Sequence, residues 1–188
     1  MKGLPVTIND RGGLTVAQIA DVSRRAKREN KIGFIMLDHL HIVRATANDV
    51  RAGATLAVGQ ISQAMKAISK ENDLPVLLLA QLNRGLLARE DKRPNMGDLR
   101  QSGDVEQDAD NILFVHRPEE YLGKGEPERR TGEEAYKYEQ RTNEWRNDVE
   151  RTAGAAEIII DKARDGEPGI VLLDFDKHTT SFKDRLNG

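Results

Sequence analysis

Two polar side chains stand directly after apolar runs that are typical of buried strands in α/β proteins. Residues 32–42 read IGFIMLDHLHI, so Asp38 closes the first run, and Gln81 follows the run PVLLLA at residues 75–80. Ligands of open α/β sheets bind at the C-terminal ends of the strands. A carboxylate there can hold hydrated Mg²⁺ against a nucleotide phosphate, and an amide can sense the γ-phosphate or orient the attacking water. A structural interpretation also stands, in which Asp38 caps a turn and Gln81 is a hydrogen-bonded core amide.

A second group of candidate residues lies in a long polar stretch. Residues 97–110 read GDLRQSGDVEQDAD. Gly97 and Gly103 allow a close approach of the backbone to a ligand, and Arg100 offers a fork of donors for phosphate. Contact with the phosphate backbone of a nucleic-acid single strand is one interpretation. The acids at alternate positions would share a face and bind a metal only in a strand, so bracing the loop is their simpler role.

Lys162 and Arg164 form a third candidate group, at the end of an apolar strand and just before a turn. Because side chains alternate along a strand, both residues lie on one face. Two cations on a rigid edge can clamp phosphates, including phosphates bound to a neighbouring subunit, as an arginine finger does. The same pattern is also typical of a charged strand end that prevents edge-to-edge pairing.

Several chemistries find no support in the sequence. Neither G-x-x-x-x-G-K-[ST] nor G-x-G-x-x-G occurs, so the 188 residues contain no phosphate-binding loop of those types. His39 and His41 flank the acid strand, but a zinc site needs a third ligand and none is evident. The sequence has no cysteine, which excludes disulfides and thiolate metal sites. No nucleophile elbow or Ser-His-Asp arrangement can be assembled.

The elements that position these residues alternate between strands and helices. Patterning predicts helices over about residues 16–30, with Thr15 as N-cap, and 51–72. Strands are predicted at residues 5–10, 32–38, 75–80, 110–116, 156–163 and 170–175. A strand, a helix and a strand of these lengths form a β–α–β crossover, which implies a parallel pair that includes the strands of Asp38 and Gln81.

Three further segments complete the chain. Residues 83–108 form the longest irregular stretch, of a length that is usually functional or mobile. Residues 123–151 are charged, with a predicted helix over 133–149 that is either a partner-facing element or a solvated insertion. Asp-Gly followed by Pro-Gly at residues 165–169 predicts a hairpin between the last two long strands. No internal repeat and no linker-bounded second domain is present, so residues 1–188 are expected to form one domain, with an insertion at about residues 123–151.

The composition fits a highly charged α/β protein. Hydrophobic residues make up 38% of the chain, charged residues 32%, and the net charge is -2. The surface as a whole is therefore not basic, and binding of nucleic acid must use a local basic loop. No apolar run approaches the roughly 20 residues of a membrane span, and the N-terminus lacks the apolar core of a signal peptide. A cytoplasmic location with no membrane partner is the expectation.

Five segments taken in order resemble the C-terminal ATPase domain of the replicative DNA helicase DnaB family. They are INDRGGLTV, FIMLDHLHIV, AISKENDLPVLLLAQLNR, DKRPNMGDLRQSGDVEQDADNILFVHR and AEIIIDKARDGEPGIVLLDF. The resemblance implies that residues 1–188 form part of a RecA-like helicase motor domain, with a mostly parallel sheet flanked by helices and a C-terminal β-hairpin. It also implies a homo-hexameric ring around single-stranded DNA that unwinds the duplex with ATP and Mg²⁺.

The resemblance assigns roles to residues of this sequence. Asp38 matches the Walker B acid that acts on Mg²⁺ through water, and Gln81 matches the glutamine that senses the γ-phosphate. Lys162 and Arg164 match the cation pair that reaches the ATP of the adjacent subunit. The residues that match the DNA-contacting loop at the ring centre are Arg100, Gln101 and Gly103. The family usually has Tyr and Gln at the positions of His39 and His41, and Glu at that of Gln101.

The family's Walker A loop and catalytic Glu lie upstream of the matching segments, as does its primase-interacting domain. The strand of the phosphate loop would sit between the strands at residues 75–80 and 110–116, so this sequence predicts an incomplete core with two unpaired apolar edges. An alternative function is a non-enzymatic module that binds helicase subunits or single-stranded DNA without ATP hydrolysis. Recombinase-like binding of single strands without unwinding is a third hypothesis.

Overall fold

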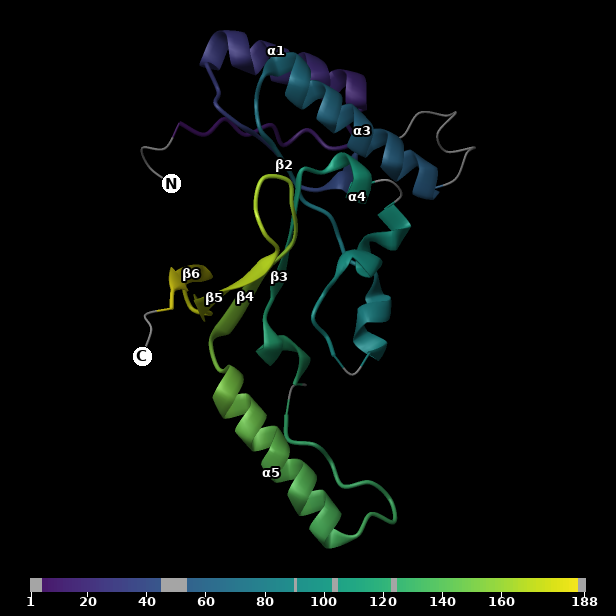
Figure 1. The fold of residues 1–188 in the computed structure, drawn as a ribbon, viewed down its shortest axis with the longest axis vertical. Coiled ribbons are helices and arrows are strands. Elements are labelled where there is room, and N and C mark those ends of the chain that lie inside the picture. The colour runs from purple at the N-terminus through teal and green to yellow at the C-terminus, as the bar shows by residue number, and fades with distance from the viewer. Residues whose placement is uncertain (1–4, 45–53, 90, 103–104, 123–124, 186–188) are drawn as a thin grey trace. The chain divides into compact units, whose positions relative to one another are not determined.

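The computed structural model describes residues 5–44, 54–89, 91–102, 105–122 and 125–185, and divides the chain into two compact units (Figure 1). Unit 1 comprises the described residues up to Asn83 together with Leu99–Ala109. Unit 2 comprises Arg84–Asp98 and the described residues from Asp110 onward. Each unit has its own sheet and is described separately.

Unit 1 contains a parallel pair of short strands and two helices. Strand β1 (Ile35–Leu37) pairs with β2 (Val76–Leu78) in register, with Ile35 opposite Val76. Helix α3 (Ala54–Asn72) connects them, so the predicted crossover and its parallel pairing are confirmed. Helix α1 (Val16–Asn30) lies alongside α3 (Figure 1), where an Arg24–Glu71 ion pair of 3.0 Å joins the two helices.

Local signals determine where α1 begins and ends. Thr15 and Gln18 form a reciprocal capping box, in which the Thr15 hydroxyl accepts from the backbone of Gln18 and the Gln18 side chain accepts from the backbone of Thr15. The helix ends at Lys31, whose φ of 50° is left-handed. That turn delays the following strand, so β1 begins at Ile35 rather than at residue 32.

A single apolar cluster holds unit 1 together, and Leu40 is its most completely buried member, with 0% exposure. Leu40 lies in the short 3₁₀ helix η1 (Leu40–Ile42), which immediately follows Asp38 and His39. Burial of Leu40 therefore anchors the chain just beyond the candidate acid. The buried cluster consists of Ile19, Leu40, Val43, Val58, Ile61, Met65, Ile68 and Val105.

The predicted strand at residues 5–10 is wrong. These residues have no regular structure, and Val6 and Ile8 are 57% and 75% exposed. A strand needs a partner for its backbone groups, and the first pairing along the described chain is the isolated parallel bridge between Thr15 and Arg44.

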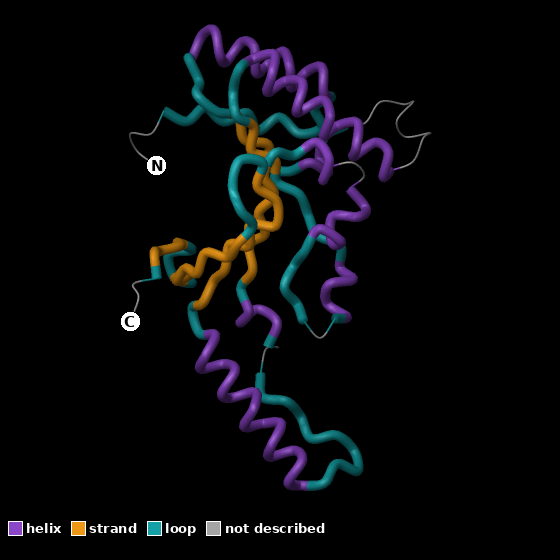
Figure 2. The backbone as a smooth tube through the Cα atoms, in the orientation of Figure 1, coloured by secondary structure: helices purple, strands orange, loops and turns teal. Residues whose placement is uncertain are grey.

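Unit 2 is built on an antiparallel sheet in the order β3-β4-β5-β6, drawn in orange with the other strands in Figure 2. The predicted hairpin joins β4 to β5, and β3 pairs with β4 on the other side. The strands are β3 (Asn111–His116), β4 (Ala155–Ala163), β5 (Gly169–Asp176) and β6 (Ser181–Asp184). Among the described residues β2 and β3 belong to different sheets, as expected for an incomplete core. The fold is α/β, with a parallel pair and a larger antiparallel part.

The charged insertion forms helix α5 (Ala135–Thr152), preceded by the short 3₁₀ helix η4 (Pro118–Tyr121). Trp145 fixes the helix to the chain that enters it, because its indole Nε1 donates to the carbonyl of Leu122 at 2.8 Å. Glu133 accepts from Arg141 and from the backbone of Arg130, and these bonds lower the pKa of Glu133 to about 2. The insertion is therefore an ordered helical element, and its role remains a prediction.

The stretch at residues 83–108 is not a simple loop. It contains the 3₁₀ helices η2 (Arg84–Ala88) and η3 (Met96–Ser102) and a single turn, α4 (Val105–Asp108). A salt bridge holds it against β4 within unit 2, where Arg93 Nε and Nη2 donate to the Glu157 carboxylate at 2.8 and 2.7 Å. Glu157 is 7% exposed, and these hydrogen bonds lower its pKa although burial opposes the shift.

We predict that Glu157→Gln lowers the unfolding free energy of unit 2 at pH 7 by about 1–3 kcal/mol, because a neutral amide replaces a charge-assisted acceptor. A carboxylate with a lowered pKa stabilises the fold above its unfolded-state pKa and loses that contribution as pH falls through the folded value. The difference between wild type and variant should therefore shrink as pH falls from 7 past the ordinary pKa of 4.5 and then through the lowered folded value.

Urea denaturation of both proteins across this pH range measures the difference, with Glu167→Gln in the exposed hairpin turn as the control. A pH-independent difference, or none at pH 7, would contradict the role given to the Arg93–Glu157 pair.

Candidate nucleotide and DNA site

Asp38 and Gln81 lie at the same edge of the β1–β2 pair, because the pairing continues beyond both strands. The backbone of Leu79 donates to Leu37 at 3.1 Å, and the backbone of Leu40 donates to Leu79 at 2.8 Å. Asp38 lies between the two Leu residues of its own segment, and Gln81 comes two residues after Leu79. Asp38 and Gln81 are both exposed, so the edge offers one carboxylate and one amide to a ligand.

His39 connects this acid-bearing turn to Gln81. Its Nδ1 accepts from the backbone N–H of His41 at 3.2 Å, and its Nε2 lies 3.4 Å from the Gln81 amide nitrogen. A neutral imidazole carries one proton, and an Nδ1 that accepts leaves that proton on Nε2. An Nε2–H can donate only to the amide oxygen, and the two ends of an amide are assigned from such partners. With that tautomer, the contact is a hydrogen bond only when the amide is turned so that its oxygen faces His39 and its NH₂ donor faces away.

The second histidine completes a small imidazole pair at this edge. The ring centroids of His39 and His41 are 5.6 Å apart. Burial, together with the neighbouring His39, lowers the pKa of His41 from its ordinary value of 6.5. His41 is thereby favoured in its neutral form at pH 7.

The fit of this edge to a nucleotide and its metal is partial. No group of three or more His, Cys, Asp or Glu residues with metal-binding geometry occurs in the part of the chain that the structure describes. A lone carboxylate suits Mg²⁺ that keeps most of its water shell, since Mg²⁺ dehydrates reluctantly. The sequence has no phosphate-loop motif. The residues present thus suit the metal-facing side of a nucleotide site and not the phosphate cradle.

The predicted DNA loop begins in η3. Arg100 and Gln101 belong to this helix, although their side chains are not described, and Gly103 lies outside the described residues. Val105, just after the loop, is buried in the apolar cluster of unit 1 at 7% exposure. The chain is therefore fixed in that cluster at Val105.

Lys162 and Arg164 lie at the end of β4 and just beyond it. Lys162 is opposite Ile112 of β3, and the backbone of Arg164 donates to the Asn111 side chain at 3.4 Å. The guanidinium of Arg164 forms an ion pair with Asp110, and its side chain is 66% exposed.

Sequence reasoning missed several residues that shape these sites. It placed no role on Arg93, Glu157 or Asp161, although a charged residue inside an apolar strand such as EIIID signals a specific partner. It rejected His39 as a zinc ligand and noted it as a departure from the family's usual Tyr, but did not predict its contact with Gln81.

A helix-covered parallel pair that ends in an acid and an amide is typical of α/β nucleotide-dependent motor domains. Two solved structures extend this likeness to the RecA-like class. One is the ATPase domain of another protein, which matches with a TM-score of 0.70 and 34% identity, over 93% of this chain and 52% of that chain. The other is the structure of a DnaB-like replicative helicase and its interactions with primase. It matches with a TM-score of 0.73 and 33% identity, over 96% of this chain and 38% of that chain.

The sequence relatives of this chain and the family that it matches point to the same class of protein. Replicative DNA helicase DnaB of Rickettsia bellii is 39% identical over 176 residues, which cover 93% of this chain and 34% of the relative. The DnaB helicase of Haemophilus influenzae is 40% identical over 177 residues, which cover 93% of this chain and 32% of the relative. The family of DnaB-like helicase C-terminal domains matches residues 1–184, and the chain belongs to this family. The chain spans about a third of the length of these relatives.

The orientation of Gln81 gives a spectroscopic prediction. In the neutral form of His39, ¹⁵N chemical shifts should show the proton on Nε2, because Nδ1 accepts from His41. Replacement with Phe, which has no ring nitrogen, should change the shifts of the Gln81 side-chain amide. The same substitution at His178, which is exposed and remote in sequence, is the control. A proton on Nδ1, or an unaffected Gln81 amide, would contradict the proposed orientation.

Proposed function

We propose that this chain is part of the motor of an ATP-dependent replicative DNA helicase, which translocates on single-stranded DNA as a hexameric ring and unwinds the duplex. The observation that carries the proposal is the placement of Asp38 and Gln81 at one edge of a parallel strand pair, in a chain of the DnaB-like family. A cytoplasmic location follows from a role in DNA replication. Across the described residues, no helix is both long and apolar enough to cross a membrane.

The residues of unit 1 would act on the nucleotide. Asp38 would hold Mg²⁺ through water, and the metal supplies charge neutralisation at the phosphates when bound. Gln81 would present its NH₂ donor toward the γ-phosphate, in the orientation that His39 favours. A complete site also needs a phosphate loop, which residues 1–188 do not contain. That loop would have to come from polypeptide outside these residues.

Residues in and just after η3 and β4 would contact single-stranded DNA and the ATP of the adjacent subunit. Arg100, Gln101 and Gly103 would contact the backbone of single-stranded DNA, with the guanidinium of Arg100 as the phosphate ligand. Lys162 and Arg164 would approach the ATP of the adjacent subunit and stabilise the charge that develops on its phosphates. The exposure of the Arg164 side chain supports this role, in which Arg164 would exchange its ion pair with Asp110 for the phosphate.

The absence of a phosphate-loop motif from the 188 residues favours a second candidate, a non-enzymatic module that joins helicase subunits or single strands. The two functions differ in one respect. A motor domain hydrolyses ATP once its phosphate loop is supplied, and the module changes only the assembly or the activity of other subunits.

The DNA role predicts a salt-dependent affinity for single strands. Fluorescence anisotropy with a labelled oligo-dT should show weaker binding as salt rises. Arg100→Ala should weaken binding about 10-fold at low salt and lower the slope of log affinity against log salt by about 0.7, since one phosphate contact is lost.

Arg151→Ala is the matched control, because it removes the same charge from an arginine whose side chain is 76% exposed at the end of α5. Equal losses in the two variants would indicate a general charge effect and remove the case for this loop. No binding by the wild-type chain at low salt would count against the DNA role as a whole.

A further inference from the structure

Strand β4 contains a bulge at Asp161. Ile112 of β3 is opposite Lys162 and Leu113 is opposite Ile160, so Asp161 has no opposing residue on β3. A bulge bends its strand and redirects a side chain, and bulges are frequent beside functional sites. Here the extra residue immediately precedes Lys162, at the end of β4 that also leads to Arg164.

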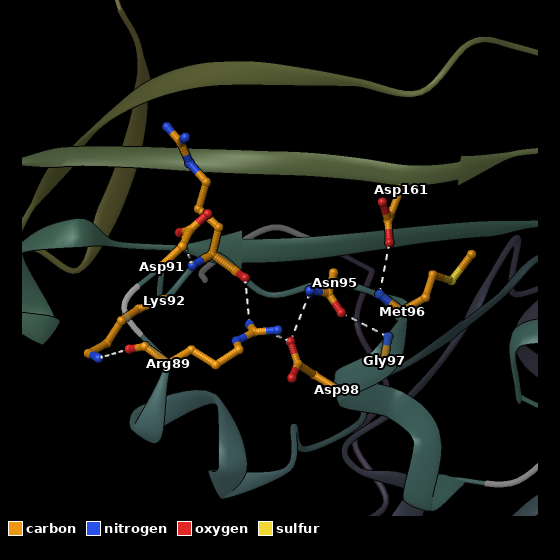
Figure 3. Close-up of polar contacts among 9 residues, drawn as sticks. Arg89, Asp91, Lys92, Asn95, Met96, Gly97, Asp98 and Asp161 are labelled. Atoms are coloured by element: carbon orange, nitrogen blue, oxygen red, sulfur yellow. Dashed lines mark hydrogen bonds and ion pairs between the residues drawn. The ribbon is translucent and has the colours of Figure 1, made fainter.

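The redirected carboxylate holds the backbone where η3 begins. Asp161 Oδ2 accepts from the backbone N–H of Met96 at 2.9 Å (Figure 3), and Met96 is the first residue of η3. The first N–H groups of a helix have no acceptor within it, so a carboxylate at this point satisfies one of them and complements their partial positive charge. Because the contact is to backbone, it fixes the path of the chain.

The residues around Met96 form a braced turn, so fixing one point fixes the turn. The Asn95 side chain accepts from the backbone of Gly97 at 2.9 Å, and Asp98 Oδ2 accepts from the backbone of Asn95 at 2.9 Å. Asp98, which is 8% exposed, also accepts from Arg89 Nη2 at 2.9 Å (Figure 3). The turn therefore responds to the Asp161 contact as one rigid piece.

Two carboxylates of β4 thus hold the segment before the DNA loop. Glu157 binds Arg93, and Asp161 binds Met96. The two acids are four residues apart on β4, and their two partners are three residues apart on the segment. The second contact is the closer one to Arg100, which lies four residues after Met96 in the same helix.

We propose that Asp161 is a positioning residue for DNA binding: through Met96 it fixes the start of η3, the helix whose later residues include Arg100 and Gln101. The inference rests on the proposed DNA role of these two residues. The end of β4 would then have two roles. The strand that carries Lys162 and leads to Arg164 would also fix the start of η3.

The test compares two substitutions of Asp161, one that removes the acceptor oxygen for the Met96 N–H and one that keeps it. Asp161→Ala removes the acceptor and should weaken oligo-dT binding about 10-fold, the effect of losing one charge-assisted hydrogen bond that orders a binding element. Asp161→Asn keeps an acceptor oxygen and should stay within about threefold of wild type, because a neutral acceptor is weaker but correctly placed. Hydrogen exchange at the Met96 amide should accelerate strongly in the Ala variant and only slightly in the Asn variant.

Two further variants keep the result interpretable. Asp174→Ala removes the same charge from β5 and should bind like wild type. Met96→Pro deletes the N–H donor and leaves Asp161 in place, and proline is well accepted at the first helical position. It should reproduce the loss of Asp161→Ala, and the double variant should show no additional loss.

The outcomes separate the inference from the function beneath it. If Asp161→Ala binds DNA like wild type while the Met96 amide exchanges faster and Arg100→Ala still loses affinity, the positioning role is overturned and the DNA role stands. Additive losses in the double variant, or an Asn variant as weak as the Ala variant, also overturn it. If the wild-type chain shows no salt-dependent affinity, the DNA role fails and the positioning role falls with it.

Discussion

The parallel pairing of β1 with β2 is the constraint on which the candidate site depends. In-register pairing places the ends of both strands at one edge, and backbone hydrogen bonds beyond the strands extend this alignment to the Asp38 turn. The complete burial of Leu40 anchors that turn in the apolar cluster. The Asp38 carboxylate and the Gln81 amide thus lie on a rigid base, which an electrostatic site requires.

The second organising feature is the placement of carboxylates within β4. Burial of Glu157 is tolerated because Arg93 supplies two hydrogen bonds, and Asp161 finds its partner in a backbone N–H. Both partners come from the segment that leads to η3. In the part of the chain that is described, β2 and β3 do not pair with each other, so unit 2 depends on its own antiparallel sheet and on these polar contacts.

Much of this arrangement could be predicted from sequence, because strong local signals determine it. The capping box at Thr15, the apolar runs before Asp38 and Gln81 and the Asp-Gly turn at residues 165–166 each specify an element or its boundary. The strand at residues 5–10 was predicted wrongly, because alternation alone does not supply a pairing partner. The Met96–Asp161 contact joins residues 65 positions apart and depends on a bulge, which no local pattern announces.

We propose that the edge bearing Asp38 and Gln81 is the metal-facing side of a nucleotide site. Paramagnetic broadening of backbone amide signals by Mn²⁺ with ATP, relative to Mg²⁺ with ATP, tests it most directly. We expect the strongest broadening at residues 37–41 and 79–82 together, and its loss in Asp38→Asn. Broadening confined to other acidic segments, such as α5, with no change at this edge, would contradict the claim.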